Sequence, residues 1–115
     1  MEQRRENRRN MCADLLTLSW TDAQGRSQRE VATLDDISAT GACLELEDAI
    51  PVGTAVTLHY PNGEYRGKIK YCTFEEIGYV IGVAFDEGYR WSKKDFEPSH
   101  LLELPFMPGK RTIPV

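Results

Sequence analysis

The sequence predicts an all-β protein: a six-stranded antiparallel β-barrel with a short C-terminal helix and a flexible N-terminal arm. Apolar and polar residues alternate with a period of two in six short stretches, and turn residues separate those stretches at regular spacing. The first ten residues contain no apolar side chain apart from Met1, which is typical of an arm. A closed barrel leaves no exposed strand edge, and this favours it over an open sheet.

The six expected strands follow one another without a helical pattern between them. They cover residues 12–20, 28–34, 42–47, 56–60, 65–74 and 79–85. A polar loop is expected over residues 35–41, and Asn62-Gly63 indicates a hairpin because it accepts the positive φ values of a tight primed turn. In the fifth strand, Ile69 and Tyr71 are expected on one face, alternating with lysines.

The segment after the last strand has a different pattern. Pro98 suits the first position of a helix, and residues 99–104 hold leucines that would dock a short helix on the barrel. The predicted organisation is an arm over residues 1–10, the barrel with its helix over residues 11–104, and a tail over residues 105–115. Four large side chains in this region are candidates for a partner-facing surface, with packing on the barrel the favoured interpretation: Tyr89, Trp91, Phe106 and Met107.

Charge is distributed unevenly along the chain. The first ten residues hold four arginines and two glutamates and so carry +2, whereas the remainder, with ten basic and sixteen acidic residues, carries −6. A localised group of guanidinium ions on an acidic protein indicates one specific anion rather than a general affinity for polyanions.

Composition excludes several classes of protein. The 41% apolar content fits a soluble globular domain, and no apolar run approaches the roughly 20 residues that span a bilayer. The basic N-terminus is not followed by the apolar segment of a secretory signal, so we expect a cytoplasmic protein without membrane insertion. Cys12, Cys43 and Cys72 form no CxxC pair and are interpreted as buried structural thiols. No histidine stands at ligand spacing from a cysteine, so neither a metal site nor a cofactor is expected.

The arginines of the arm form two pairs. Residues four apart lie on the same face of either an extended strand or a helix, which pairs Arg4 with Arg8 and Arg5 with Arg9. Each guanidinium is a planar fork of donors that suits phosphate oxygens or the acceptor edge of guanine. Taken alone, such an arm is more often a solvated tail.

A second group of polar residues lies between the second and third expected strands. Asp36 can accept hydrogen bonds from a guanine amino group or an arginine, and Ser38 offers a hydroxyl that can also close a local turn. Gly41 permits a positive φ or a close approach of backbone. Taken alone, this segment is most simply a turn that ends in glycine.

Together the two groups resemble the PilZ domain family. The head Arg4–Arg9 reads as RRxxxR, the segment Asp36–Gly41 reads as DxSxxG, and Gly82–Phe85 is similar to the closing barrel strand of that family. The resemblance covers almost the whole chain, and both motifs stand in order at the right separation on a six-strand pattern. It implies a bacterial receptor for the second messenger cyclic di-GMP that acts through a downstream partner in motility, exopolysaccharide or biofilm control.

The resemblance also implies roles for individual residues. Arg5 and Arg9 would bind guanine edges and phosphates, and Asp36 and Ser38 would contact guanine, with Gly41 allowing the loop to approach. An arginine at the position of Arg4 accompanies an intercalated pair of ligand molecules in related domains, which would give a monomer or a ligand-linked dimer. Relatives often carry proline where this chain has Arg8, so Arg4/Arg8 is a competing register for the clamp. Additional candidates for the site are Arg8, Cys43 and Gly82.

Three other functions are weighed against this one. An enzyme would need a convergent nucleophile and base, but His59 is expected to be solvated and His100 to lie in the tail helix, so no catalytic residue is predicted. A nucleic-acid-binding barrel would use aromatic platforms, but the acidic body would repel a phosphate backbone. A PilZ-like adaptor that binds proteins without nucleotide is the main alternative, although such adaptors typically lack one of the two motifs.

Overall fold

The computed structural model describes residues 9–102, which form six β-strands and no helix, hence no helix that could span a bilayer. The strands are β1 (Asn10–Thr21), β2 (Ser27–Ser38), β3 (Gly41–Leu46), β4 (Ala55–Tyr60), β5 (Gly63–Glu75) and β6 (Gly78–Phe85). All six predicted strands are confirmed, and most are longer than predicted because the sheet pairing continues past the alternating apolar residues into polar ones.

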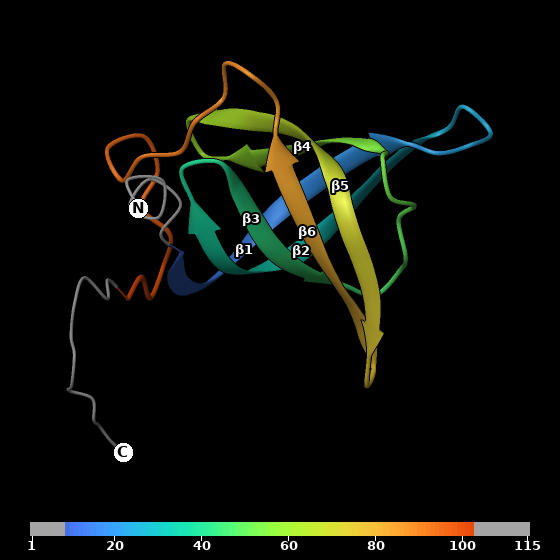
Figure 1. The fold of residues 1–115 in the computed structure, drawn as a ribbon, viewed down its shortest axis with the longest axis horizontal. Helices are drawn as coiled ribbons and strands as arrows, with labels where there is room; N and C mark the ends of the chain where they lie inside the picture. The colour runs from blue at the N-terminus through green and yellow to red at the C-terminus, as the bar shows by residue number, and fades with distance from the viewer. Residues whose placement is uncertain (1–8, 103–115) are drawn as a thin grey trace.

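The strands form a closed antiparallel barrel in the order β1-β2-β3-β6-β5-β4. Four pairs join consecutive strands: β1 with β2, β2 with β3, β4 with β5, and β5 with β6. β3 and β4 are consecutive but do not pair; β3 pairs with β6 and β1 with β4, which closes the sheet. In Figure 1, β5 and β6 cross in front of β1 and β2, which lie on the opposite wall of the barrel. Closure leaves the barrel with two kinds of surface: an interior filled by side chains and an outer face available for ligands.

The interior follows from the period-two pattern. Every strand contributes at least one large apolar side chain that is no more than 2% exposed, among them Leu18, Leu34, Leu44, Leu58, Ile69 and Ile81. Truncating a buried leucine or isoleucine to alanine typically costs about 2–5 kcal/mol, so each of these six side chains contributes substantially to the stability of the barrel.

The coil after β6 covers one end of the barrel. Phe96 stacks on Tyr60, which in turn stacks on Tyr65, with centroid separations of 5.1 and 4.8 Å. Trp91 is only 9% exposed, and its Nε1–H donates a hydrogen bond to the carbonyl of Phe96 at 2.8 Å. Tyr89 is partly buried against the same core. These contacts support packing rather than a partner-facing role for Tyr89 and Trp91, whereas Phe106 and Met107 lie outside the described residues.

The predicted helix over residues 99–104 is not formed in the part that the structure describes. Residues 99–102 instead run antiparallel to the start of β1, where the Leu102 N–H donates to the Met11 carbonyl at 2.8 Å. β4 covers β1 only from Thr17 onward, so the first half of β1 has an open edge whose backbone groups need partners. This tertiary pairing outweighs the local helix signal.

Two turns differ from the prediction. β2 continues through Ser38, so most of the expected polar loop over residues 35–41 is strand, and Ala39-Thr40 alone forms the turn into β3. β4 and β5 are joined by Pro61 and Asn62 as a hairpin, but Asn62 does not adopt a positive φ. The primed turn was therefore wrong, because the register places Gly63 in the strand rather than in the turn.

The three cysteines are free thiols of intermediate exposure rather than fully buried side chains. Cys43 follows and precedes core residues in β3, so strand alternation turns its side chain to the outer face. Within residues 9–102, no group of three or more histidine, cysteine or acidic side chains is arranged to hold a metal ion.

Candidate ligand-binding site

A β-bulge in β2 turns the DxSxxG motif toward the outer face of the barrel. β2 pairs with β3 in register up to Leu34 and resumes at Asp36, which leaves Asp35 as an extra residue. One inserted residue reverses the side to which all later side chains point. The core position therefore passes from Leu34 to Ile37, both fully buried, while Asp36 and Ser38 share the outer face.

A second bulge in β5 makes a matching shift. The pairing of β5 with β6 is irregular between Ile69 and Tyr71, with Lys70 as the extra residue. The expectation that Ile69 and Tyr71 share a face is therefore wrong. Ile69 points into the core, whereas Tyr71 is 41% exposed and lies opposite Gly82 of β6.

The two bulges align a row of outward side chains across four neighbouring strands. β2, β3, β6 and β5 contribute, in that order, Asp36, Cys43, Gly82 and Tyr71. Neighbouring strands lie about 4.8 Å apart, so this row is about 14 Å long. The adjacent row, nearer the β2–β3 turn, holds Ser38, Gly41 and Ala84.

Arg9 and Asp36 form an ion pair at the edge of this row. Nη2 of Arg9 donates to Oδ2 of Asp36 at 3.0 Å, and the carboxyl side chain is 10% exposed while the arginine is 67% exposed. The hydrogen bond to Asp36 is the main reason that the pKa of Arg9 is raised. A carboxylate so nearly buried needs a charged partner, and the arm supplies it.

Ser38 and Gly41 shape the turn beside the ion pair. The Ser38 hydroxyl accepts from the Thr40 N–H at 3.3 Å and donates to the Gly41 carbonyl at 3.4 Å, so it closes the local turn. Gly41 has no positive φ; a Cβ there would collide with the carbonyl oxygen of Val83. Glycine is therefore required for the close approach of β3 to β6, one of the two roles that the sequence allowed.

Tyr71 lies flat across the neighbouring strand. A Cβ on Gly82 would collide with the Tyr71 ring, so the ring occupies the space that any larger residue would fill. The Tyr71 hydroxyl reaches Sγ of Cys43 at 3.6 Å, and this contact, with partial burial, raises the pKa of Tyr71 to about 12. The outer face of the ring thus stands next to the Arg9–Asp36 pair as an uncharged aromatic platform.

These residues line a hollow of about 490 Å³, within the range of small-molecule sites. It brings together the predicted residues that the structure describes: Arg9, Asp36, Ser38, Gly41, Cys43 and Gly82. It also contains Lys70 and Tyr71, which sequence reasoning missed. The signal that could have found Tyr71 is an aromatic residue opposite a strand glycine, because a ring commonly covers the backbone that glycine leaves open.

The family model for the PilZ domain matches residues 2–91, which is more than half of the chain. The chain belongs to the PilZ family. The resemblance inferred from the two motifs is thereby confirmed.

Among solved structures, this PilZ domain is similar to the PilZ domain with c-di-GMP of YcgR from Escherichia coli, with a TM-score of 0.56 and 16% sequence identity. The likeness covers 74% of this chain and 79% of that chain, and at this identity it shows the shared fold. No match was found among curated proteins.

The remaining predicted residues of the PilZ arm, Arg4, Arg5 and Arg8, lie outside the described residues. The choice between the Arg5/Arg9 and Arg4/Arg8 registers therefore stays a prediction. Arg9 alone is placed, and it is placed beside the DxSxxG motif rather than away from it.

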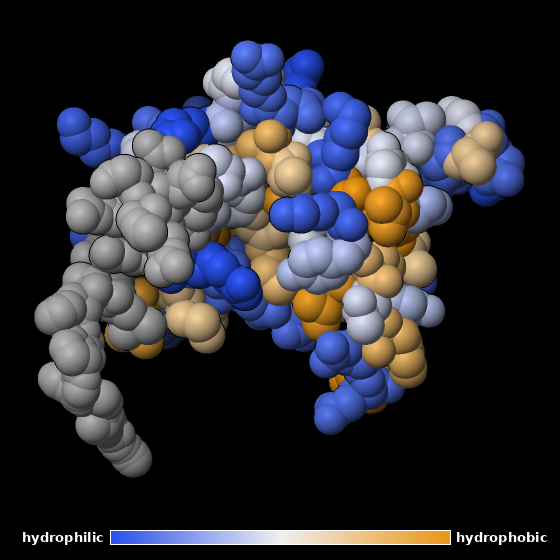
Figure 2. Space-filling view, in the orientation of Figure 1, coloured by the Kyte–Doolittle hydropathy of each residue, from blue (hydrophilic) through white to orange (hydrophobic). Residues whose placement is uncertain are grey.

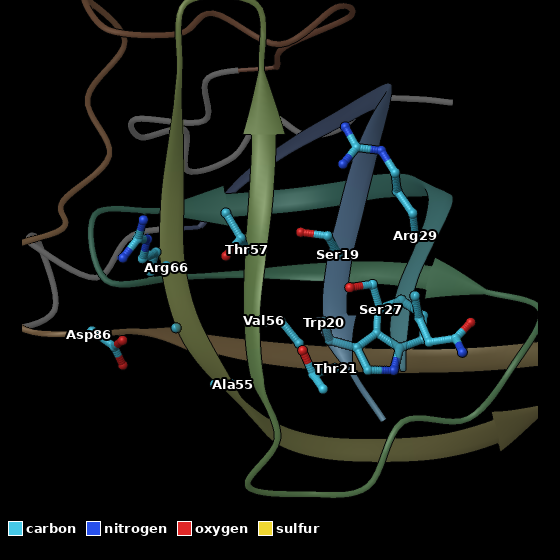
Figure 3. A pocket seen from close by; sticks show the side chains of 12 residues that line it. Ser19, Trp20, Thr21, Ser27, Arg29, Ala55, Val56, Thr57, Arg66 and Asp86 are labelled. Atoms are coloured by element: carbon cyan, nitrogen blue, oxygen red, sulfur yellow. The ribbon is translucent and has the colours of Figure 1, made fainter. Parts of the chain in front are cut away.

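A second, larger hollow of about 820 Å³ lies elsewhere on the PilZ barrel. Figure 3 shows the side chains of Ser19 and Thr57 on neighbouring strands, with Arg29 and Arg66 to either side. Arg66 already pairs with Glu64 at 2.8 Å, and none of the predicted site residues that the structure describes lines this hollow. Size alone therefore does not identify the functional site.

His59 of the PilZ barrel is half-buried rather than solvated as expected. Its Nε2 lies 2.8 Å from Oγ of Ser19, and its Nδ1 lies 3.9 Å from Oε1 of Glu64. The longer distance is not a hydrogen bond, so among residues 9–102 no carboxylate orients the His59 ring through one.

Proposed function

We propose that this PilZ domain is a receptor for cyclic di-GMP, bound in the 490 Å³ hollow on the outer face of β2, β3, β6 and β5. The observation that carries the proposal is the Arg9–Asp36 ion pair at its edge. It sets a fork of donors and a nearly buried acceptor side by side. A cyclic dinucleotide of guanosine offers the complement of both, because it has anionic phosphates and guanine edges that carry donors as well as acceptors.

Each group of the hollow has a role in this proposal. Arg9, with Arg5 of the arm, holds phosphate oxygens or the guanine O6/N7 edge in a bidentate way. Asp36 accepts from guanine N–H groups, and Ser38 adds a hydroxyl at the turn. Tyr71 presents its ring face to a guanine base, where base–aromatic stacking contributes about 1–3 kcal/mol.

The existing ion pair lowers the cost of closing the arm. Fixing the backbone of one residue costs roughly 1–2 kcal/mol. Arg9 is already held by Asp36, so closing residues 5–8 around ligand would cost at most about 4–8 kcal/mol. Several charge-assisted hydrogen bonds with one stacked base can offset that amount.

Arg9 supports the Arg5/Arg9 register, because it contacts the motif aspartate directly. In this register Arg4 directly precedes the clamp, and we propose that it accompanies an intercalated pair of ligand molecules. The receptor would then be a monomer, or a dimer linked by ligand.

Ligand binding in the cytoplasm would change the conformation of the arm, and a downstream protein in motility, exopolysaccharide or biofilm control would read that change. The protein would act as a receptor and not as an enzyme. The alternative is a PilZ-like adaptor that acts through protein partners without binding nucleotide. The following experiment distinguishes the receptor from this adaptor.

Isothermal titration calorimetry with cyclic di-GMP tests the proposal. We expect saturable binding with one or two ligands per chain, and no binding of cyclic di-AMP, whose bases lack the guanine amino group and O6. Arg29→Ala, in the other hollow, is the matched control and should bind like the parent protein. A correctly folded protein that binds neither dinucleotide would contradict the proposal and favour the adaptor.

A further inference from the structure

Farther along β3 and β6, the outer face changes in character. Glu45 lies opposite Val80, two residues beyond Cys43 and Gly82. Those two residues line the 490 Å³ hollow proposed for cyclic di-GMP, which we call the nucleotide hollow. Two strand residues span about 6.7 Å, so the two regions adjoin. Here β2, β3 and the end of the β5–β6 hairpin enclose a separate hollow of about 610 Å³, which we call the β3–β6 hollow.

Apolar side chains stand exposed in and around the β3–β6 hollow. Val31 is 63% and Ile77 is 95% exposed, and both line it together with Val80. Phe74, at the adjoining hairpin end, is 60% exposed but does not line the hollow; it pairs with Tyr79, one residue from Val80, and so lies on the other face of the hairpin. In the space-filling view, hydrophobic and hydrophilic side chains border one another at this end of the molecule (Figure 2). Grouped exposed apolar side chains with a polar rim are typical of interaction surfaces.

Carboxylates dominate the charge of the same hollow. Four glutamates line it, namely Glu45, Glu47, Glu75 and Glu76, and among the described residues that line it there is no lysine or arginine. The repulsion extends toward the nucleotide hollow. Burial, a hydrogen bond to Glu45 and the nearby charges raise the pKa of Asp35 to about 7. A cation that enters here relieves this repulsion, which an anion would increase.

We infer that the β3–β6 hollow is a docking surface for a protein segment that carries lysine or arginine side chains next to apolar ones. The apolar side chains of the partner cover Val31, Val80 and Ile77, and its cations pair with the surrounding glutamates. Anionic polymers and anionic membrane surfaces are repelled by the same carboxylates, so the partner is a protein. The inference goes beyond nucleotide binding and does not depend on it.

The position of the surface gives it a functional meaning. A partner seated there lies beside the nucleotide hollow, because β3 and β6 form part of both. Asp35 connects the two regions: it directly precedes Asp36 of the nucleotide hollow, and its carboxyl is hydrogen-bonded to Glu45 of the β3–β6 hollow. Charge brought by a ligand on one side therefore acts on the carboxylates that face the partner.

The probe for this inference is a short synthetic peptide in which leucine and lysine alternate, with a leucine–glutamate peptide as its counterpart. Both are titrated into the ¹⁵N-labelled protein, and amide shifts are followed by NMR. We expect the lysine peptide to shift the amides of Val31, Glu45 and Val80, and the glutamate peptide to leave them unchanged.

Two double variants with the same net charge separate a specific surface from a general attraction to an acidic protein. Glu45→Lys with Glu47→Lys should weaken binding of the lysine peptide about tenfold or more. Glu87→Lys with Glu97→Lys changes two exposed glutamates that do not line the hollow and should weaken it far less. Val80→Thr keeps the charge and the strand propensity, and it should still reduce affinity because an apolar contact is lost.

Three results would overturn the inference. Equal losses in the two double variants would mean that only net charge attracts the peptide. Amide shifts centred on another face would place the site elsewhere. The third result is dimerisation, measured by light scattering, of the parent protein but not of the variant with Glu45→Lys and Glu47→Lys. It would mean that a second copy of the chain, and not a basic partner, occupies the surface.

Discussion

The nucleotide hollow and the β3–β6 hollow lie on one outer face of β3 and β6, yet the two are built differently. In the first, bulges at Asp35 and Lys70 interrupt strand alternation and align small or polar groups around a nearly buried carboxylate. In the second, Glu45 and Val80 pair in a regular ladder and expose longer side chains. Irregular pairing thus makes a compact site with fixed donors and acceptors, whereas regular pairing makes a broader surface whose charge and apolar area are its main properties.

The largest expected effect is on the affinity for cyclic di-GMP, which should depend on residues of the arm and the nucleotide hollow and not on the β3–β6 hollow. Arg5→Ala and Arg9→Ala should each weaken cyclic di-GMP binding by about 2–4 kcal/mol, because each leaves phosphate or guanine acceptors unpaired. Glu45→Gln, in the β3–β6 hollow, should change it far less. Calorimetry on the three variants measures this. If Arg4→Ala and Arg8→Ala lose affinity while the first two variants retain it, the Arg4/Arg8 register is the correct one.

The next effect concerns the stability of the shared strands. Gly41→Ala should lower the free energy of unfolding by about 1–3 kcal/mol, because its Cβ would meet the rigid backbone of Val83. In Gly82→Ala the three atoms nearest to the new Cβ all belong to the side chain of Tyr71, which can rotate away, so the loss of stability should be smaller. Urea denaturation of both variants checks the order. A larger loss for Gly82→Ala would show that the Tyr71 ring is as fixed as the backbone.

Tyr71 offers a sharper test of the nucleotide hollow. Tyr71→Ala removes the aromatic platform and should weaken ligand binding by about 1–3 kcal/mol. Tyr71→Phe removes only the long 3.6 Å contact to Cys43 and should retain most of the affinity. Equal losses in the two variants would mean that the hydroxyl, and not the ring face, holds the ligand.

The smallest effect is a pH dependence that arises from the carboxylates near the β3–β6 hollow. Burial is the main reason that the pKa values of Asp35 and Glu30 are raised to about 7, with hydrogen bonds to Glu45 and Asp48 adding to the shift. Between about pH 4 and pH 7 the folded protein therefore binds more protons than the unfolded chain, whose carboxyls titrate near 4. Stability should rise as pH falls from 8 to 5, by about 1 kcal/mol because both groups are partly solvated.

Asp35→Asn supplies the control for this pH dependence. The asparagine side chain does not titrate, so the slope of the unfolding free energy against pH should become shallower, as measured by urea denaturation at several pH values. A parent protein that is less stable at pH 5 than at pH 8 would contradict the assignment.

Much of the barrel could be predicted from the sequence, because one face of each strand is turned to the core and the other face to water. This alternation identified all six strands. A contact between the arm and the DxSxxG motif could also be predicted from the sequence, because the guanidinium of Arg9 and the carboxylate of Asp36 have opposite charges. Arg4, Arg5 and Arg8 lie outside the described residues, and their roles stay predictions.

The bulges could not be predicted from the sequence. A bulge shifts the alternation of inward and outward side chains, and the sequence reveals such a shift only where it changes the order of apolar and polar residues. Asp35 and Asp36 are both acidic, so the sequence does not mark which of them is the extra residue. In β5, polar and apolar residues alternate regularly in the sequence through Lys70 and Tyr71. In the structure, the bulge at Lys70 interrupts the alternation of inward and outward side chains at this point. The helix over residues 99–104 failed for a related reason: the open edge of β1 is a property of the assembled barrel and not of the local segment.

The pairing of Met11 with Leu102 places the beginning and the end of the described segment, residues 9–102, side by side. A domain that the chain enters and leaves at neighbouring points permits circular permutation and insertion into a host protein. The barrel is therefore suited to a genetically encoded reporter: with a fluorescent protein fused before residue 9 and another after residue 102, the proposed closing of the arm on ligand would be read as a change in energy transfer. New ends for a permuted version belong in the loop around Val52, which is 66% exposed and lines neither hollow.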